Sequence, residues 1–319
     1  MTGARWLGAV LLACAGVVQG EPYPSQPIRL IVPWPPGGGV DTAARIIAQP
    51  LGQRLGQSVV IENRPGAAGN IGTELAARAR PDGYTLLMGS VSPNAINVHL
   101  YSRLGFDPVK DFAPVLYVTA VPNILVVPAN STANTALELI AEARANPGKL
   151  NYGSAGVGSS QHLAAAMLIA STGINIVHVP YKGTAGAETD LIAGHIALLL
   201  DTTACLPFVA AGKMKALAVA AKERNPALPN VPTFDELGVP GVLSGAWYGL
   251  MAPAGTPREI IDKVNAEANA MLRTPEMRKR LAEFGGEPGG GTPEEFARFI
   301  AAETVRYAEV VKLSGAKME

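Results

Sequence analysis

Three loops rich in glycine and serine are the segments of this chain best suited to hold a ligand. They cover residues 35–41, 66–70 and 154–160, and each follows a predicted strand and precedes a predicted helix. Glycines let the backbone approach a ligand closely, and a helix N-terminus offers unpaired N–H groups with a partial positive charge. Open α/β sheets bind ligands at the carboxyl ends of their strands. Each loop alone also fits a tight turn, but together the three loops favour a shared site for a carboxylate or a phosphate.

Nucleotide-binding motifs do not match these loops. The first loop reads PPGGGVD rather than G-x-G-x-x-G, and Gly153, Gly156 and Gly158 have the wrong order of spacings for that motif. The sequence also lacks the G-x-x-x-x-G-K-[ST] pattern of a P-loop. We therefore expect no dinucleotide or other cofactor.

Side chains with catalytic or metal-binding potential are sparse. Ser159, Ser160 and His162 lie close together, but no serine has the G-x-S-x-G surroundings of a nucleophile elbow, and a helix cap is the favoured role for either serine. The four histidines show no metal-ligand spacing, and Cys205 is the only cysteine after the first twenty residues. We therefore expect no metal site, no intramolecular disulfide and no enzymatic activity. An exported hydrolase that uses Ser160 and His162 remains an alternative hypothesis.

Two further segments are candidates for the same sheet edge. Asp201 follows the apolar strand 197–200, so it either binds ligand at the end of that strand or caps the next helix, and both roles stay open. The turn Tyr181-Lys182-Gly183 follows the strand that begins at Ile176, and Lys182 is predicted to be solvated.

Composition indicates a globular protein without net charge. The 319 residues are 48% hydrophobic and 16% charged, which excludes a disordered chain. Lys and Arg total 26, as do Asp and Glu, so nothing favours nucleic acid or an anionic membrane surface as a partner. Selectivity for an anion would then come from local N–H dipoles rather than from long-range attraction.

The first twenty residues predict export. Arg5 precedes an apolar run of about 13 residues that ends near Gly20, which is shorter than the roughly 20 residues that a membrane span needs. We expect a signal peptide over residues 1–20, cleaved near Gly20, and a periplasmic protein. Lipid attachment at Cys14 is not expected, because apolar residues continue past the cysteine. An exported protein has no supply of ATP or nicotinamide cofactors.

The remaining chain alternates short apolar runs with helical runs, as in doubly wound α/β proteins. The predicted strands are 28–32, 58–62, 84–88, 115–118, 124–127, 150–153, 176–179, 197–200, 216–220 and 247–252. The helices that we single out are one capped near Asp41 and kinked or interrupted at Pro50, then 71–79, 161–171, 257–272 and 293–312. Two such series predict two lobes with largely parallel sheets.

The motifs in these loops resemble a known family, the Bug-type (TctC-like) periplasmic solute-binding proteins of tripartite tricarboxylate transporters. The resemblance spans essentially the whole chain after the leader and is specific because all the pieces occur in order. They are residues 27–38, 60–72, 81–87, 150–156, 160–163, 179–183, 252–257 and 292–296.

The resemblance implies a two-lobed periplasmic-binding-protein fold of type II, in which each lobe is a mostly parallel sheet flanked by helices and the ligand lies in the cleft between them. Lobe one would comprise residues 24–122 and 236–319, and lobe two residues 123–235. The family holds a carboxylate with backbone amides and ordered waters. Carried over by position, the ligand-binding residues would be Pro36, Gly37, Gly38, Gly39, Val40, Asp41, Ser90, Asn94, Ser154, Ala155, Gly156, Ser159, Ser160, His162, Tyr181, Gly183 and Asp201.

The implied function is capture of a small carboxylate and its delivery, by hinge closure, to the membrane permease subunits of a tripartite tricarboxylate transporter. The ligand could be a di- or tricarboxylate, an amino acid or an aromatic acid, and the protein is expected to be a monomer. Gly39 stands where many members have Ser or Thr, and Asp201-Thr202-Thr203 differs from the commoner Asp-Asn. Ligand identity therefore does not follow from the family. A binding protein that signals to a membrane kinase is the second hypothesis.

Overall fold

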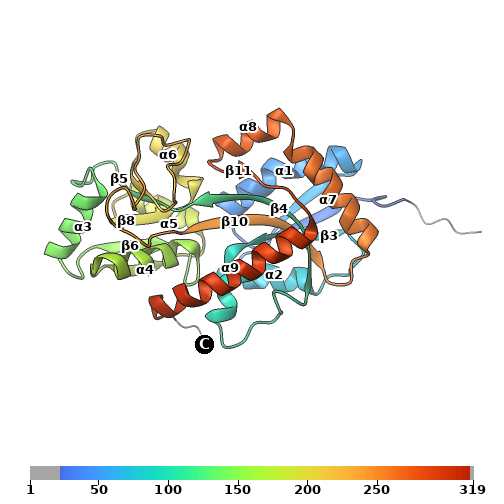
Figure 1. Cartoon of the computed structure of the whole chain (residues 1–319), viewed down its shortest axis with the longest axis horizontal. Helices are drawn as coiled ribbons and strands as arrows, with labels where there is room; N and C mark the ends of the chain where they lie inside the picture. Colours follow the sequence, from blue (N-terminus) through green and yellow to red (C-terminus); the bar gives the residue numbers. More distant parts are fainter. Residues whose placement is uncertain (1–21, 317–319) are drawn as a thin grey trace, which may run out of the picture.

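The computed structural model describes residues 22–316, and these fold around two β-sheets that lie side by side (Figure 1). The predicted signal peptide lies outside the described residues. The first sheet has the strand order β11-β4-β10-β3-β1-β2. Its strands are Ile28–Val32 (β1), Val59–Asn63 (β2), Thr85–Ser90 (β3), Phe112–Pro122 (β4), Gly245–Pro253 (β10) and Glu287–Pro288 (β11).

The second sheet has the order β7-β6-β8-β5-β9. Its strands are Ile124–Pro128 (β5), Asn151–Ser154 (β6), Val177–Pro180 (β7), Leu198–Asp201 (β8) and Met214–Val219 (β9). The α-helices are Gly39–Leu55 (α1), Asn70–Ala77 (α2), Ala136–Ala145 (α3), Ser160–Thr172 (α4), Thr184–Ile192 (α5), Leu206–Ala210 (α6), Arg258–Leu272 (α7), Pro275–Glu283 (α8) and Pro293–Ser314 (α9). Short turns of other helical types are Ala67–Gly69 (η1), Ser92–Ile96 (η2), Asn97–His99 (η3) and Thr203–Cys205 (η4).

Both sheets are mixed rather than mostly parallel. In the first sheet β1 pairs in parallel with β2 and β3, whereas β10 runs antiparallel to both β3 and β4. In the second, β6 is parallel to β7 and β8, and β5 is antiparallel to β8 and β9. Strands β4, β5 and β10, which make antiparallel pairs, lie at the crossings between the sheets, so their direction is set by the crossing rather than by a βαβ unit.

The chain crosses between the sheets at two adjacent points. Asn123 separates β4 from β5, and Ser244 directly precedes β10 on the return. The Asn123 N–H donates to the Ser244 carbonyl at 2.9 Å, and the Ser244 hydroxyl donates to Asn123 Oδ1, also at 2.9 Å. Figure 1 shows β4 and β10 running together across the middle of the molecule. These crossings are the covalent links that a movement of one sheet relative to the other would bend.

Helix α1 differs from its predicted form at both Asp41 and Pro50. Its N-cap is Gly38, which has no side chain to cap with, and Asp41 lies inside the first turn. The helix continues through Pro50 to Leu55. Pro50 removes one helical hydrogen bond, but the buried Ile47, Leu51 and Leu55 lie on one face and hold both halves of the helix against the core.

Helix α8 lies in a stretch to which the sequence pattern assigned no element. Only Met277 and Leu281 of this helix are buried, so its apolar periodicity is weak. Its N-terminus was the stronger signal, because Thr274 caps the helix and Pro275 occupies its first turn. The last helix, α9, agrees with its predicted start and begins with a capping box formed by Thr292 and Glu295.

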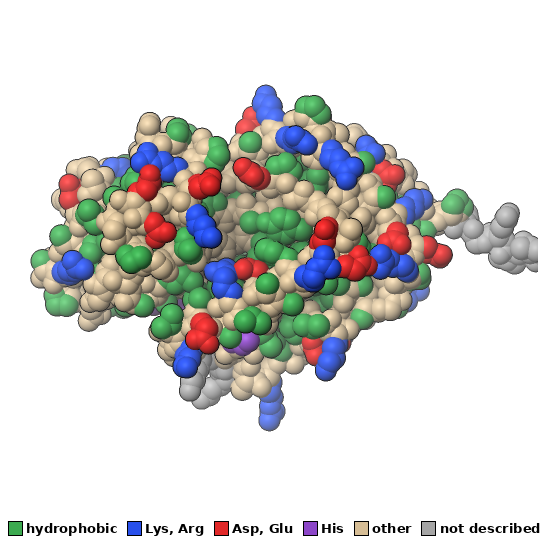
Figure 2. All heavy atoms as spheres, in the orientation of Figure 1, with side chains coloured by type: hydrophobic (Ala, Val, Ile, Leu, Met, Phe, Trp, Pro, Cys, Tyr) green, Lys and Arg blue, Asp and Glu red, His purple; other side chains and the backbone are tan. Residues whose placement is uncertain are grey.

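Acidic and basic side chains are interspersed over the face shown in Figure 2, as expected for a chain without net charge. The same face is hollowed between the two halves of the molecule, and hydrophobic side chains lie inside the hollow.

Candidate functional site

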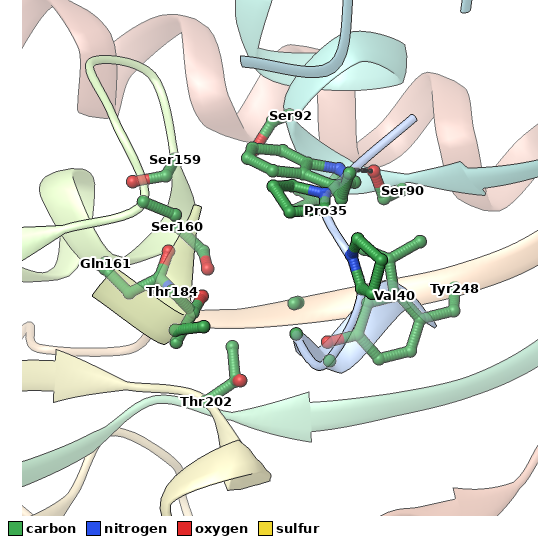
Figure 3. A pocket seen from close by; sticks show the side chains of 18 residues that line it. Pro35, Val40, Ser90, Ser92, Ser159, Ser160, Gln161, Thr184, Thr202 and Tyr248 are labelled. Atoms are coloured by element: carbon green, nitrogen blue, oxygen red, sulfur yellow. Dashed lines mark hydrogen bonds between the residues drawn. The ribbon is translucent and has the colours of Figure 1, made fainter. Parts of the chain in front are cut away.

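A small cavity of about 40 Å³ lies between loops of the two sheets (Figure 3). None of its 18 lining residues is charged, and its polar groups are hydroxyls, one side-chain amide, the Trp34 indole N–H and backbone groups. The lining residues are Trp34, Pro35, Pro36, Gly38, Gly39, Val40, Ser90, Val91, Ser92, Ala155, Ser159, Ser160, Gln161, Thr184, Ala185, Thr202, Ala246 and Tyr248.

Three helices begin at the wall of this cavity. Helix α1 begins at Gly39, α4 at Ser160 and α5 at Thr184, and all three residues line the cavity. The first N–H groups of each helix have no partner within the helix and carry a partial positive charge. One helix comes from the first sheet and two from the second, so an anion in the cavity would be held from both sides.

Eight of the sequence-predicted residues line the cavity itself. They are Pro36, Gly38, Gly39, Val40, Ser90, Ala155, Ser159 and Ser160. Ser159 caps α4 by accepting a hydrogen bond from the His162 N–H, and its own hydroxyl donates to the Gly156 carbonyl at 2.7 Å. The expected capping role of Ser159 is therefore confirmed.

The other nine predicted residues do not line the cavity. They are Gly37, Asp41, Asn94, Ser154, Gly156, His162, Tyr181, Gly183 and Asp201. Four of them, Asp41, Asn94, Ser154 and His162, accept backbone hydrogen bonds that hold the loops in place.

Asp41 shapes the first loop from behind. Its Oδ2 accepts hydrogen bonds from the Gly37 N–H at 3.0 Å and from Arg45 at 2.8 Å, and its Oδ1 accepts one from Asn63 at 2.8 Å. Burial alone would raise the pKa of Asp41, but the hydrogen bonds from Arg45, Gly37 and Asn63 bring it below its ordinary value. Asp41 is thus an ionised anchor whose charge is already neutralised. Asn94 has a similar role, because its Oδ1 accepts a hydrogen bond from the Ser90 N–H at 3.1 Å.

The third loop rests on a stack of three rings. His178 lies between Tyr152 and His162, with ring centroids 4.8 and 4.4 Å away. His178 Nε2 lies 2.7 Å from the Ser154 hydroxyl, and His162 Nδ1 accepts a hydrogen bond from the Gly158 N–H at 3.3 Å. Burial lowers the pKa of both histidines to about 4, with the neighbouring His178 contributing at His162. Both rings are therefore neutral at neutral pH.

The turn before α5 packs against the first loop. Gly183 has φ +115°, and a Cβ there would lie 2.8 Å from Pro35 Cγ, so this N-cap position requires glycine. Tyr181 is not among the residues that line the cavity, and its hydroxyl donates to Asp190 at 2.6 Å.

Asp201 does not cap the following helical turn, and it does not line the cavity. Thr202 is the N-cap of η4, while Asp201 is fully buried and its Oδ1 accepts a hydrogen bond from the Thr202 N–H at 2.7 Å. Its carboxyl faces the buried carboxyl of Glu188. Burial and the neighbouring Glu188 hold the pKa of Asp201 well above its ordinary value.

Several residues that line the cavity were not predicted from the sequence. Trp34 directly precedes the first loop, and its Nε1 donates to the Ser90 hydroxyl at 3.1 Å. Thr184 and Ala185 follow the predicted turn at residues 181–183, and the rule that ligands meet helix N-termini is the signal that could have found them. Tyr248 and Ala246 come from β10, and no local signal in the sequence links that strand to the loops.

Comparison with known proteins identifies the family. The sequence profile of the tripartite tricarboxylate transporter family receptor (TctC) matches residues 43–315. The chain belongs to this family. It is 37% identical over 315 residues to protein BugT of Bordetella pertussis, covering 97% of both chains.

Solved structures agree with this assignment. A Rhodopseudomonas palustris protein solved with adipate is 38% identical, with a TM-score of 0.91 over 93% of this chain and 100% of that one. MatC from the same species, solved with malate, is 33% identical, with a TM-score of 0.86 over 91% of this chain and 100% of that one. The two-lobed α/β fold of periplasmic binding proteins is thereby confirmed.

Members of the family are solute-binding receptors and not enzymes, which confirms the expected lack of enzymatic activity. The geometry agrees, because a neutral His162 whose Nδ1 accepts the Gly158 N–H carries its proton on Nε2 and has no free lone pair to activate a nucleophile. Between residues 22 and 316, no helix combines the length and apolar character that crossing a membrane requires.

Proposed function

We propose that this chain is an extracytoplasmic solute-binding protein that captures a small carboxylate in the cavity and delivers it to the permease of a tripartite tricarboxylate transporter. The observation that carries the proposal is the meeting of three helix N-termini at a cavity without charged side chains. Such a site offers N–H donors and hydroxyls to an anion, and it offers a cation no counter-charge. The adipate and malate in the two R. palustris structures support a carboxylate.

Binding is proposed to close the two lobes about the crossings at Asn123 and Ser244. Lobe one would be residues 24–122 and 236–319, and lobe two residues 123–235. The cavity draws on both sheets, so a ligand would contact both lobes only when they approach each other. The ligand would drive closure because it binds the closed state more tightly than the open state, and the closed form would dock on the permease.

The first experiment is thermal unfolding of the purified protein without its leader against mono-, di- and tricarboxylates, amino acids and aromatic acids. A ligand at 100 times its Kd adds about 2.7 kcal/mol to the stability. For a chain of this size the expected rise in Tm is roughly 5–10 °C. No shift with any acid, in protein first unfolded and refolded to release co-purified ligand, would contradict the proposal.

Gly38→Val tests the position of the site. Gly38 has φ −80° and ψ 172°, and an added Cβ would meet nothing closer than the Pro35 carbonyl at 3.9 Å. The variant should therefore fold normally and yet bind the acid more weakly, because its side chain would enter the cavity. Ala211→Val, at an exposed position outside the cavity, is the control. Unchanged affinity in Gly38→Val would overturn the assignment of the loop.

A further inference from the structure

The first turn of α1 lacks a side chain where it meets β10. A Cβ at Gly39 would lie 2.5 Å from Tyr248 Oη and 3.2 Å from Thr202 Oγ1. Tyr248 is carried by β10 of the first sheet, and Thr202 follows β8 of the second. The absence of a side chain at Gly39 thus lets a hydroxyl of one sheet reach a hydroxyl of the other at the cavity wall.

The hydroxyl groups of Thr202 and Tyr248 both lie beside Gly39 at the cavity wall. Thr202 Oγ1 accepts the Ala204 N–H at 3.4 Å as the N-cap of η4, so its own O–H remains a donor for the neighbouring Tyr248 Oη. Burial raises the pKa of Tyr248 above its ordinary value, so the phenol stays protonated. Its O–H is therefore a donor at the cavity wall.

The position of Tyr248 makes that proton available to a ligand. The ring is buried with 1% exposure, yet Tyr248 lines the cavity. Figure 3 shows its hydroxyl directed toward the side of the cavity that holds Thr202 and Thr184. A fixed donor of this kind requires an acceptor, because a ligand that presents only N–H groups there leaves the donor unpaired.

We propose that Tyr248 is the specificity-determining residue of the cavity, and that its hydroxyl donates a hydrogen bond to a second acceptor oxygen of the bound acid. The proposal rests on the proposed function and narrows it to dicarboxylates and hydroxy or keto acids. An α-amino acid is disfavoured because its ammonium would meet the positive ends of three helices and no carboxylate among the residues that line the cavity. Thr202 is a positioning residue that acts through Tyr248.

Calorimetric titration with adipate, malate and aspartate tests the proposal. Malate and aspartate differ only by a hydroxyl in place of an ammonium on the same carbon. We expect adipate or malate to bind, and aspartate to bind about 10-fold more weakly or less well still. Tyr248→Phe should weaken binding of the preferred acid by about 10-fold or more, because a hydrogen bond to a charged group is lost.

Gly39→Ala separates the proposed role from a general effect on folding. Its Cβ would displace the Tyr248 hydroxyl, so it should weaken binding in the wild type but cause no further loss in Tyr248→Phe. Thr202→Val should likewise weaken binding only when the Tyr248 hydroxyl is present. Thr203→Val is the matched control, because Thr203 is equally buried, its hydroxyl has no hydrogen-bond partner and it does not line the cavity. The control should bind like the wild type.

Two results would overturn the proposal in distinguishable ways. If no carboxylate binds the wild type, the proposed function fails and this inference fails with it. If an acid binds but Tyr248→Phe keeps its affinity, or if aspartate is preferred, the protein is a carboxylate receptor whose specificity is set elsewhere. If Gly39→Ala reduced the binding affinity equally with and without the Tyr248 hydroxyl, Gly39 would act on the helix and not through Tyr248.

Discussion

The stacked histidines beneath the third loop predict that the protein loses stability in weak acid. His162 is 8% exposed, its ring lies 4.4 Å from that of His178, and its Nδ1 accepts the Gly158 N–H. These contacts require a neutral ring. The pKa of His162 is lowered from 6.5 to about 4 by burial and by His178. A base whose pKa falls on folding stabilises the folded state above 6.5, and this contribution is lost as the pH falls toward 4.

The size of the effect follows from the two pKa values of His162. One pKa unit corresponds to about 1.4 kcal/mol, so the full shift amounts to about 3 kcal/mol of unfolding free energy. At pH 5 the folded form is still mostly neutral while the unfolded form is protonated, and about 2 kcal/mol of this is already lost. The lowered pKa of His178 acts in the same direction.

Urea unfolding of the wild type and His162→Gln between about pH 8 and pH 5 measures this contribution. The wild type should lose about 2 kcal/mol more than the variant over this range, whatever the difference between them at pH 8. His99→Gln, at an exposed histidine, is the control and should follow the wild type. Equal losses of unfolding free energy in the wild type and in His162→Gln would refute the reasoning. Because protonation of Nδ1 in the folded protein would also release the Gly158 N–H, carboxylate affinity should fall only as the pH approaches the folded-state pKa of about 4.

Three further predictions test the surroundings of the cavity. Asp201→Asn should lose less stability than the wild type as the pH rises. Because the pKa of Asp201 is raised on folding, its carboxyl stabilises the folded state in acid and loses this contribution as the pH rises; urea unfolding at a series of pH values measures the difference. Gly183→Ala should weaken carboxylate binding in calorimetry, because its Cβ would strike Pro35 at 2.8 Å from a backbone with φ +115°, and wild-type affinity would argue against the contact. Trp34→Phe should remove most of the fluorescence change on binding, since Trp34 lines the cavity, and a retained change would assign the signal to another aromatic residue.

Local sequence signals predicted most strands and the loops that hold the site. Apolar runs bounded by Pro and Gly marked β1 to β3, and the glycines before α1 and the serines before α4 marked two of the helix N-termini at the cavity. These signals work because strand burial and helix capping depend on residues close together in the chain. The same reasoning misjudged α1, where burial of Ile47, Leu51 and Leu55 outweighs the effect of Pro50.

The sequence by itself determined a leader-like segment, alternating strands and helices, and anion-binding loops without basic residues, because each of these depends on composition or short-range pattern. The tertiary structure alone decided which of those loops line the same cavity and which side chains support them. Tyr248 enters the cavity from β10 because the chain returns from the second sheet antiparallel to β3 and β4. Asp201 faces Glu188 rather than the cavity because of how α5 packs over β8. Contacts between residues far apart in the chain leave no local pattern, so only the folded structure could show them.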